Sequence, residues 1–303
     1  MKIRLPLALR GLITTLGLLA AFQAIAQVPA QLAGRQFLWE VSSLTNKVYL
    51  YGTVHAGRKD WYPLPAPVEK ALEDSAVLVV EADITDTKAI STTEYSMTYK
   101  APDSLAAHVS KEDYERFRKL LPRYAITEQQ LSHMKPFMAV SVLVFSEWAR
   151  LGFLPSLGID SYLIRKAKEQ KKAIVELEGV DSQMRLMDSL TEDEHRDAFE
   201  GTVKALETGL IGEQIVGMVN AWQTGDPGLM LEVARKYNEN VTGARDFEEK
   251  FVWSRHEAMM KKIEGYLNDS KERHFIAVGS LHLAGPRGLV EMLRKKGYVV
   301  RQR

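Results

Sequence analysis

The chain has 303 residues, of which 46% are hydrophobic and 26% charged, a composition typical of a globular protein and not of a disordered or fibrous one. Its formal net charge of +1 excludes the strongly basic surface that attracts nucleic acid, so we expect no nucleic-acid partner. The absence of cysteine excludes disulfides, thiol nucleophiles and zinc sites with thiolate ligands. Any metal ligands must therefore come from the seven histidines and the carboxylates.

The first 26 residues have the three parts of a secretory signal peptide. Positive charges at positions 2, 4 and 10 precede an apolar run over 11–22, and Ala24-Ile25-Ala26 has the small-x-small pattern of a cleavage site. The alternative is an uncleaved membrane anchor, but about twelve apolar residues are fewer than the roughly 20 that span a bilayer. We therefore expect cleavage after Ala26, export to a bacterial periplasm, and no membrane span in the mature chain.

Runs of β-branched and aromatic residues predict short strands towards both ends of the remaining chain. Segments 37–41 and 47–51 form a predicted hairpin, and further strands are predicted at 77–82, 173–177, 275–278 and 298–301. The runs at 77–80 and 275–278 are apolar without alternation, which is typical of strands covered on both faces. The pattern predicts an α/β fold with a central, mostly parallel sheet flanked by helices.

The middle of the chain is predicted to be mainly helical. Helices are expected from Ser110, which begins a capping-box-like segment, over 136–151, over 191–222 as one or two helices, over 246–267 as one long helix, and over 286–296. No repeat or low-complexity linker interrupts this part of the chain. We interpret 27–303 as a single domain with a helical insertion at about 100–270.

Two identical Gly-x-x-His patterns each follow directly after a predicted strand. They are Gly52-Thr53-Val54-His55 and Gly279-Ser280-Leu281-His282. The motif alone is weak, because short patterns recur by chance, and its position at strand ends gives it meaning. A glycine with positive φ would let the backbone turn sharply as it leaves the strand. Each histidine would then lie at the carboxyl edge of the sheet, where ligands of open α/β sheets bind.

A carboxylate comes to the same predicted edge, because Glu81 directly follows the strand at 77–80. Two histidines and one carboxylate, here His55, His282 and Glu81, could hold a divalent metal ion with open positions for water and substrate. Imidazole ligands favour zinc and carboxylates favour manganese, and the sequence leaves this choice open. Without a metal the same side chains could act as general base and acid. A structural alternative is that the histidines only cap strand ends.

Two further charged residues are secondary candidates. Glu178 follows the short predicted strand at 173–177 and could be a metal ligand, a partner of a ligand or a base, or simply a carboxylate at a helix N-terminus. Arg255 could bind a substrate carboxylate or a developing oxyanion, and the alternative is an ordinary surface ion pair. The other five histidines are expected on solvated faces; they are at positions 108, 133, 195, 256 and 274. The motifs of serine hydrolases, zincins, dinucleotide-binding and P-loop proteins are absent from the sequence.

Ordered blocks of sequence along nearly the whole mature chain carry a family resemblance. They are Tyr49–His55, Tyr62–Pro65, Val79–Asp83, Gly158–Asp160, Leu177–Glu178 with Gln183, Trp222 with Gly225-Asp226, and Ala277–Gly285 before Gly297-Tyr298. In this order they resemble the TraB/PrgY/GumN family, whose members include the TIKI metalloproteases. The resemblance implies a core related to the ChaN and erythromycin-esterase-like folds with a large helical insertion, and it places His55, Glu81 and His282 at the family's proposed active-site positions.

The resemblance also implies a metal-dependent, peptidase-like hydrolase that acts on peptide or protein substrates. The catalytic candidates are then Glu81, Glu178 and Arg255, the metal ligands His55, Glu81 and His282, and the substrate-binding candidates Gln183 and Asp160. Two positions depart from the family pattern, since Gly179 stands where Thr is frequent and His256 where Asn is frequent. Two alternatives stay open: a non-catalytic protein that binds or sequesters a peptide, and a metal-free, esterase-like hydrolase with His55 as base.

Overall fold

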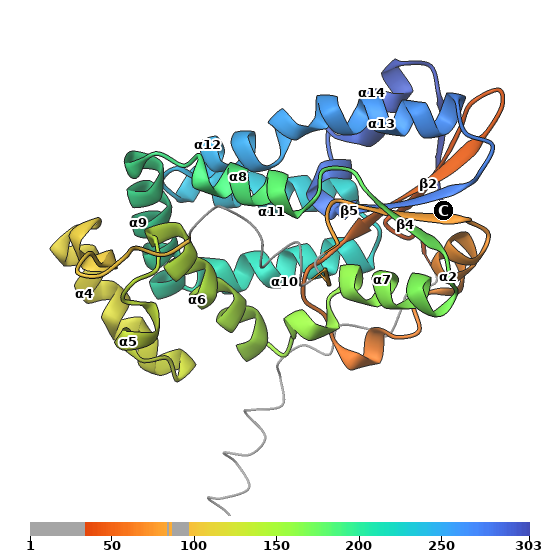
Figure 1. The fold of residues 1–303 in the computed structure, drawn as a ribbon. Coiled ribbons are helices and arrows are strands. Elements are labelled where there is room, and N and C mark those ends of the chain that lie inside the picture. Colours follow the sequence, from red (N-terminus) through yellow and green to blue (C-terminus); the bar gives the residue numbers. More distant parts are fainter. Residues whose placement is uncertain (1–33, 84, 87–96) are drawn as a thin grey trace, which may run out of the picture. The chain divides into compact units, whose positions relative to one another are not determined.

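The computed structural model describes residues 34–83, 85–86 and 97–303 (Figure 1). The predicted signal peptide at 1–26 lies outside the described residues. Segment 35–303 forms one compact unit. In the part of the chain that the structure describes, none of the helices is both long enough and apolar enough to span a membrane.

Six strands form one mixed sheet in the order β4-β3-β5-β2-β1-β6. They are β1 (Leu38–Ser42), β2 (Lys47–Thr53), β3 (Val77–Val80), β4 (Ala173–Glu176), β5 (His274–Gly279) and β6 (Val299–Gln302). Strands β4, β3, β5 and β2 run parallel, whereas β1 is antiparallel to both of its neighbours, β2 and β6. The predicted α/β fold with a mostly parallel sheet is confirmed, and so is the hairpin.

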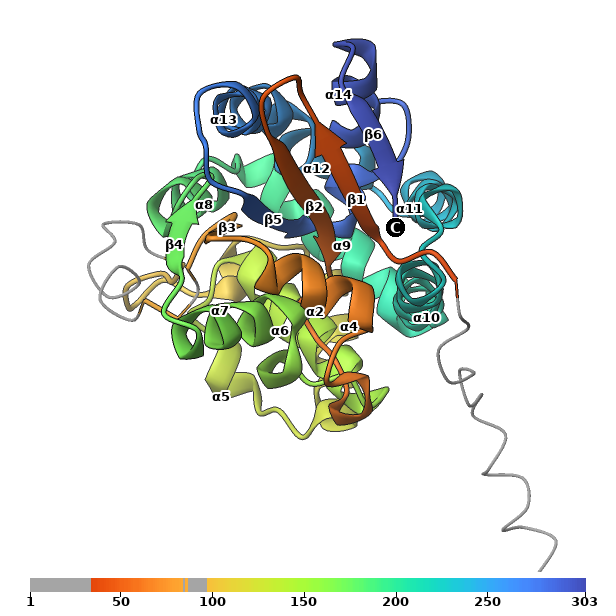
Figure 2. The same ribbon diagram turned by 90° about the vertical axis from the view of Figure 1, so that its right-hand side faces the viewer.

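Helices cover both faces of the sheet, which explains the apolar runs in the central strands. Helices α2 (Ala66–Glu73) and α7 (Ile159–Glu169) lie on one face, and α13 (His256–Asn268) and α14 (Leu289–Lys295) lie on the other (Figures 1 and 2). Every residue of β3 and five of the six in β5 are buried, whereas the edge strands β4 and β6 alternate between exposed and half-buried residues. This is the burial expected for parallel strands between two helical layers.

The other helices gather beyond one end of the sheet (Figure 1). They are α4 (Lys111–Leu120), α5 (Glu128–Leu131), α6 (Pro136–Arg150), α8 (Val180–Asp188), α9 (Glu192–Thr208), α10 (Leu210–Gln223), α11 (Pro227–Asn240) and α12 (Ala244–Phe251). Short 3-10 helices at 59–61, 105–107, 121–124, 155–157, 253–255 and 280–283 connect these elements. Ser110 caps α4 by accepting a hydrogen bond from the Asp113 amide at 3.0 Å, as its sequence predicts.

The single long helix predicted over 246–267 is wrong, because the chain breaks into α12, a 3-10 helix at 253–255 and α13. The two halves bury their apolar faces against different partners. In α12, Phe247 and Phe251 pack against Phe137 of α6, with ring centroids 5.2 and 5.7 Å away. In α13, positions 259, 260, 263 and 267 are buried, and the helix lies over the sheet (Figure 1). One straight helix cannot present a continuous apolar stripe to both, so the chain reorients at the break.

Candidate active site

The four parallel strands each deliver one predicted site residue to the same edge of the sheet. Glu178 follows β4, Glu81 follows β3, His282 follows β5 and His55 follows β2. The strand ends are bonded to one another, since the Glu178 amide donates to the Glu81 carbonyl at 3.0 Å and the Gly279 amide donates to Glu81 Oε1 at 2.7 Å. Given the strand order, Glu81 and His282 lie in the middle of the edge, with Glu178 and His55 on either side.

The glycines of the two Gly-x-x-His patterns do not act through positive φ, which corrects the sequence expectation. Neither has a positive φ, and Gly279 has φ −50° and ψ 137°. Gly52 is required by space instead, because a Cβ atom there would lie 2.4 Å from the Phe37 ring and 3.0 Å from Ser280 Oγ. Ser280 Oγ donates to the Thr53 carbonyl at 2.8 Å, so this close approach joins the ends of β2 and β5.

Arg255 is the centre of a buried charged network. Its Nε donates to Glu178 Oε1 at 2.9 Å, and its Nη2 donates to carboxylate oxygens of both Glu178 and Glu81. Its Nη1 donates to the Phe251 carbonyl at 2.6 Å and lies 3.2 Å from Nε2 of His282. The side chains of Arg255, Glu81 and Glu178 are each 13% exposed. Burial alone would lower the pKa of Arg255, but the two carboxylates raise it above its usual value.

The charges at the middle of the edge do not balance. Burial would raise the pKa of Glu81, but His282, which is protonated at the low pH where Glu81 titrates, lowers it to about 2 together with Arg255 and the Gly279 amide. Burial lowers the pKa of His282 to about 3, so this imidazole is neutral at pH 7 and the cation that faces Glu81 is Arg255. Two carboxylates therefore share one guanidinium, and this part of the site favours a further positive charge.

His55 has a different setting, although it belongs to the same sequence pattern. Its Nδ1 lies 2.9 Å from Oδ2 of Asp160, and Thr53 Oγ1 donates to Oδ1 of Asp160 at 2.7 Å. Asp160 is in the first turn of α7, where the helix dipole stabilises a carboxylate. Asp160 raises the pKa of His55 to about 9, and the charges of Glu81 and Arg255 also act on it. The side chain of His55 is 65% exposed, so its other ring nitrogen is open to a ligand.

His256 was expected on a solvated face, but it is a buried residue of the site. It is 2% exposed, its Nε2 lies 2.9 Å from Nδ1 of His282, and its Nδ1 lies 2.9 Å from the Arg287 carbonyl. The same expectation is wrong for His195 and His274, which are 4% and 5% exposed. The signal was present for His256, because it shares helical spacing with the buried apolar residues of α13 at 259, 260 and 263.

Gln183 of α8 also reaches this network, since its Nε2 donates to Oε2 of Glu81 at 3.4 Å. The structure thus brings Glu81, Glu178, Gln183, Arg255 and His282 into one bonded group, and it places His55 and Asp160 beside that group as a pair. These residues come from four strand ends and from three helical segments, α7, α8 and the 3-10 helix at 253–255.

The residue types suit a divalent metal ion, since both imidazoles have Nδ1 bonded to a protein partner, as metal-binding histidines do. A metal at His55 would have to displace the Nε2 proton that its pKa of about 9 keeps in place at pH 7. As the side chains stand, however, Arg255 binds both Glu81 and Nε2 of His282. Within the described ranges, no three His, Asp or Glu side chains are grouped closely enough to hold a metal. A metal would have to replace the bonds that Arg255 makes.

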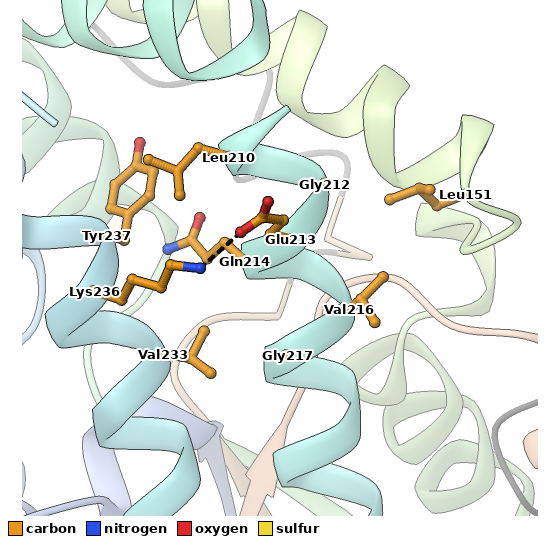
Figure 3. Close-up of a pocket in the computed structure, with 10 residues that line it drawn as sticks. All are labelled: Leu151, Leu210, Gly212, Glu213, Gln214, Val216, Gly217, Val233, Lys236 and Tyr237. Carbon is orange, nitrogen blue, oxygen red and sulfur yellow. Dashed lines mark hydrogen bonds and ion pairs between the residues drawn. The ribbon is translucent and has the colours of Figure 1, made fainter. Parts of the chain in front are cut away.

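A pocket of about 580 Å³ lies elsewhere, between α10 and α11 (Figure 3). It is lined by Leu151, Leu210, Gly212, Glu213, Gln214, Val216, Gly217, Val233, Lys236 and Tyr237. Its two charged side chains face each other, since Lys236 Nζ donates to Glu213 Oε2 at 2.7 Å. None of the predicted site residues lines this pocket.

Comparison with known proteins identifies a family. The pattern of the TraB/PrgY/gumN family matches residues 37–302. The chain belongs to this family. It is 26% identical to YbaP of Escherichia coli (strain K12) over 273 residues, which cover 88% of this chain and 96% of that protein. The family region contains every predicted site residue and all six strands.

More distant relatives in the comparison are named metalloproteases. Metalloprotease TIKI2 of Xenopus tropicalis is 23% identical over 87% of this chain, and metalloprotease TIKI1 of Danio rerio is 22% identical over 87%. The matches cover 59% and 62% of those proteins, so the chain spans about three fifths of their length. No solved structure matches. Membership of the TraB/PrgY/gumN family is therefore shown by sequence.

Proposed function

We propose that this member of the TraB/PrgY/gumN family is a metal-dependent hydrolase of peptide bonds, with His55, Glu81 and His282 as metal ligands. The observation that carries the proposal is the orientation of the two imidazoles. Each has its Nδ1 held by a partner, Asp160 for one and His256 for the other, and each is placed at the edge that also holds Glu81. The metalloprotease names of the distant relatives support the reaction class.

A bound divalent ion, zinc or manganese, would supply an activated water and polarise the carbonyl of a peptide bond. The excess negative charge around Glu81 and Glu178 favours such a cation. His55 and His282 would offer Nε2, which is the nitrogen left over when Nδ1 is bonded to a protein partner. For the ion to bind, Arg255 must give up its contacts with His282 and Glu81. Its guanidinium is then free to bond other groups.

The neighbouring side chains have roles that follow from their contacts. Arg255, which Glu178 holds through Nε, would stabilise the oxyanion or grip a substrate carboxylate. Gln183 would orient Glu81, which it already contacts, and contact the substrate. Asp160 would keep the His55 ring in place and form part of the wall that faces the substrate.

The test compares the wild type with a His55→Ala/His282→Ala double variant and with His133→Ala as a matched surface control. Metal content is measured by elemental mass spectrometry after exposure to limiting zinc and manganese, and cleavage of a pooled peptide library is followed by mass spectrometry. We expect stoichiometric metal and cleavage that a chelator abolishes in the wild type and the control, and neither in a folded double variant. Metal-free wild type with no cleavage would refute the proposal.

A second candidate is a metal-free hydrolase in which His55 is the general base. Because Asp160 raises the pKa of His55 to about 9, the unprotonated base forms only as the pH approaches that value, so cleavage should rise with pH up to about 9. Two observations favour this candidate. Arg255 already bonds Glu81 and His282, so these side chains are not free to bind a metal as they stand. His55 with Asp160 resembles a base with its orienting carboxylate. It predicts peptide or ester cleavage that survives chelation and is lost in His55→Ala. Tight peptide binding without any cleavage would instead indicate a sequestering protein.

We further propose that the chain is exported to the periplasm, with cleavage after Ala26. The charges, apolar run and small-x-small pattern of the first 26 residues support this proposal. Fractionation of expressing cells followed by N-terminal sequencing should give a periplasmic form that begins at Gln27. A form that keeps Met1 and stays with the membrane would contradict it.

A further inference from the structure

Four groups in the site form a line of hydrogen bonds through two buried histidines. The Arg287 carbonyl lies 2.9 Å from Nδ1 of His256, and Nε2 of His256 lies 2.9 Å from Nδ1 of His282. Nε2 of His282 then lies 3.2 Å from Nη1 of Arg255. His256 and His282 are 2% and 4% exposed, so water has little access to compete for these bonds.

The two ends of this line have fixed polarity, and together they determine both tautomers. A backbone carbonyl can only accept, so His256 must carry a proton on Nδ1. A guanidinium can only donate, so His282 must offer a lone pair on Nε2. The remaining bond between the rings is then satisfied in one way, with Nδ1–H of His282 donating to Nε2 of His256. No other placement of the protons makes all three bonds at once.

We propose that His256 is a positioning residue that fixes the Nδ1–H tautomer of His282 and so keeps the Nε2 lone pair of His282 turned towards Glu81 and Arg255. This inference rests on the proposed function, because the lone pair is the group that a metal would need. His256 touches neither substrate nor reacting atoms and acts only through His282. No proton is gained or lost; only the position of one proton on the His282 ring is decided.

The proton of the neutral His282 ring could also sit on Nε2, and His256 disfavours that tautomer. Nε2 of His282 lies 3.6 Å from Oε1 of Glu81, and a carboxylate oxygen is an acceptor. If Nδ1 of His282 lost its acceptor, a proton on Nε2 would face Glu81 and the lone pair would turn away from the site. His256 makes that alternative unfavourable by accepting from Nδ1.

The first test reads the tautomer directly in the full metal-free chain labelled with 15N-histidine. Long-range proton–nitrogen NMR correlations distinguish a protonated ring nitrogen from one with a lone pair. We expect His282 to be protonated on Nδ1 and unprotonated on Nε2. His274 is an internal reference, since its Nδ1 lies 2.9 Å from the Glu272 carbonyl, away from the site. A wild-type His282 protonated on Nε2 would overturn the inference whatever the protein does with metal.

Two matched variants then separate a positioning role from a structural one. His256→Asn carries an amide that reaches as far as Nδ1, so it keeps a donor for the Arg287 carbonyl but loses the acceptor for His282. His256→Gln reaches as far as Nε2 and keeps that acceptor. We expect the share of His282 in the Nδ1–H tautomer to fall in His256→Asn, where only the bond from Arg255 still favours it, and to stay at the wild-type level in His256→Gln, with His274 unchanged in both. An unchanged His282 tautomer in a folded His256→Asn would overturn the inference.

Zinc binding by titration calorimetry gives the second readout. Loss of a hydrogen-bonding partner of a ligand typically weakens metal binding by about 10–100-fold, so we expect a loss of this size in His256→Asn and a smaller one in His256→Gln. Wild type with the expected tautomer but without zinc binding or cleavage would refute the proposed function and leave the tautomer assignment standing. Equal zinc affinities in wild type and a folded His256→Asn would overturn the positioning role.

Discussion

Replacement of Arg255 by Met should destabilise the protein strongly and in a way that depends on pH. Methionine keeps much of the aliphatic packing of the arginine but none of its donors. Glu81 and Glu178, each 13% exposed, would lose their shared cation. Removing one partner of a buried ion pair costs about 3–5 kcal/mol, because the remaining charge stays buried without compensation. At about 2–4 °C per kcal/mol, the thermal midpoint should fall by about 6–20 °C at pH 7.

The pH dependence has a definite sign. The pKa of Glu81 is lowered to about 2 in the folded wild type, below its usual value of 4.5. Its contribution to stability is therefore fully present above pH 4.5 and is lost as the pH falls towards 2. Without Arg255 the folded pKa of Glu81 rises, so that contribution shrinks. The difference between wild type and Arg255→Met should be largest at pH 7 and should narrow between pH 5 and pH 3.

The assay is thermal unfolding followed by circular dichroism at pH 7, 5 and 3, with Arg118→Met as the control. Arg118 also donates to two carboxylates, Glu115 and Glu128, but its side chain is 45% exposed and solvent screens the pairs. Arg118→Met should leave the midpoint almost unchanged. The reasoning fails if both variants lose similar stability at pH 7, or if the deficit of Arg255→Met is the same at pH 3 as at pH 7.

Two further predictions concern residues around the site and the helical part. Burial would raise the pKa of Glu147, but Arg150 and Arg123 hold it below its usual value. Glu147→Gln should therefore lower the thermal midpoint most above pH 4.5. Thermal midpoints measured from pH 7 to pH 3 should show the difference from wild type becoming smaller in acid. In Gly158→Ala, the new Cβ would lie 2.5 Å from the His55 carbonyl, so stability should fall by about 1–3 kcal/mol in urea unfolding. Gly265→Ala is its control, because the new Cβ would meet only Asp269 at 3.9 Å, and a gain of up to about 1 kcal/mol is expected. Equal effects of the two alanines would contradict the steric argument.

The strands and several helix ends were predictable because their signals are local. Apolar runs without polar alternation predicted β3 and β5, because helices cover both faces of these strands. Ser110 predicted the start of α4, which it caps by accepting from the amide three residues later. The carboxyl ends of β2, β3, β4 and β5 could also be matched with His55, Glu81, Glu178 and His282, since each side chain follows its strand within a few residues. That the four strands are neighbours depends on pairing between residues up to 226 positions apart, which no local pattern shows.

The position of Arg255 was harder to predict, because it depends on a broken helix. The chain turns at 252–255 so that Phe247 and Phe251 can pack against α6 while α13 covers the sheet. This turn aims Arg255 at Glu81 and Glu178 and starts α13 with His256 facing inward. The apolar periodicity over 246–267 predicted neither the position of Arg255 nor the burial of His256. Periodicity shows which residues share a helix face, but it does not show which element that face packs against.

The two Gly-x-x-His patterns show most clearly where sequence reasoning ends. His55 and His282 follow the same motif and come to the same sheet edge, yet Asp160 raises the pKa of one to about 9 and burial lowers the pKa of the other to about 3. The difference comes from surroundings outside the motif: Asp160, in the first turn of α7, contacts His55, whereas His282 is buried beside His256, the first residue of α13. The motif therefore determines that a histidine lies at the sheet edge, whereas residues from distant segments determine whether and where its ring is protonated.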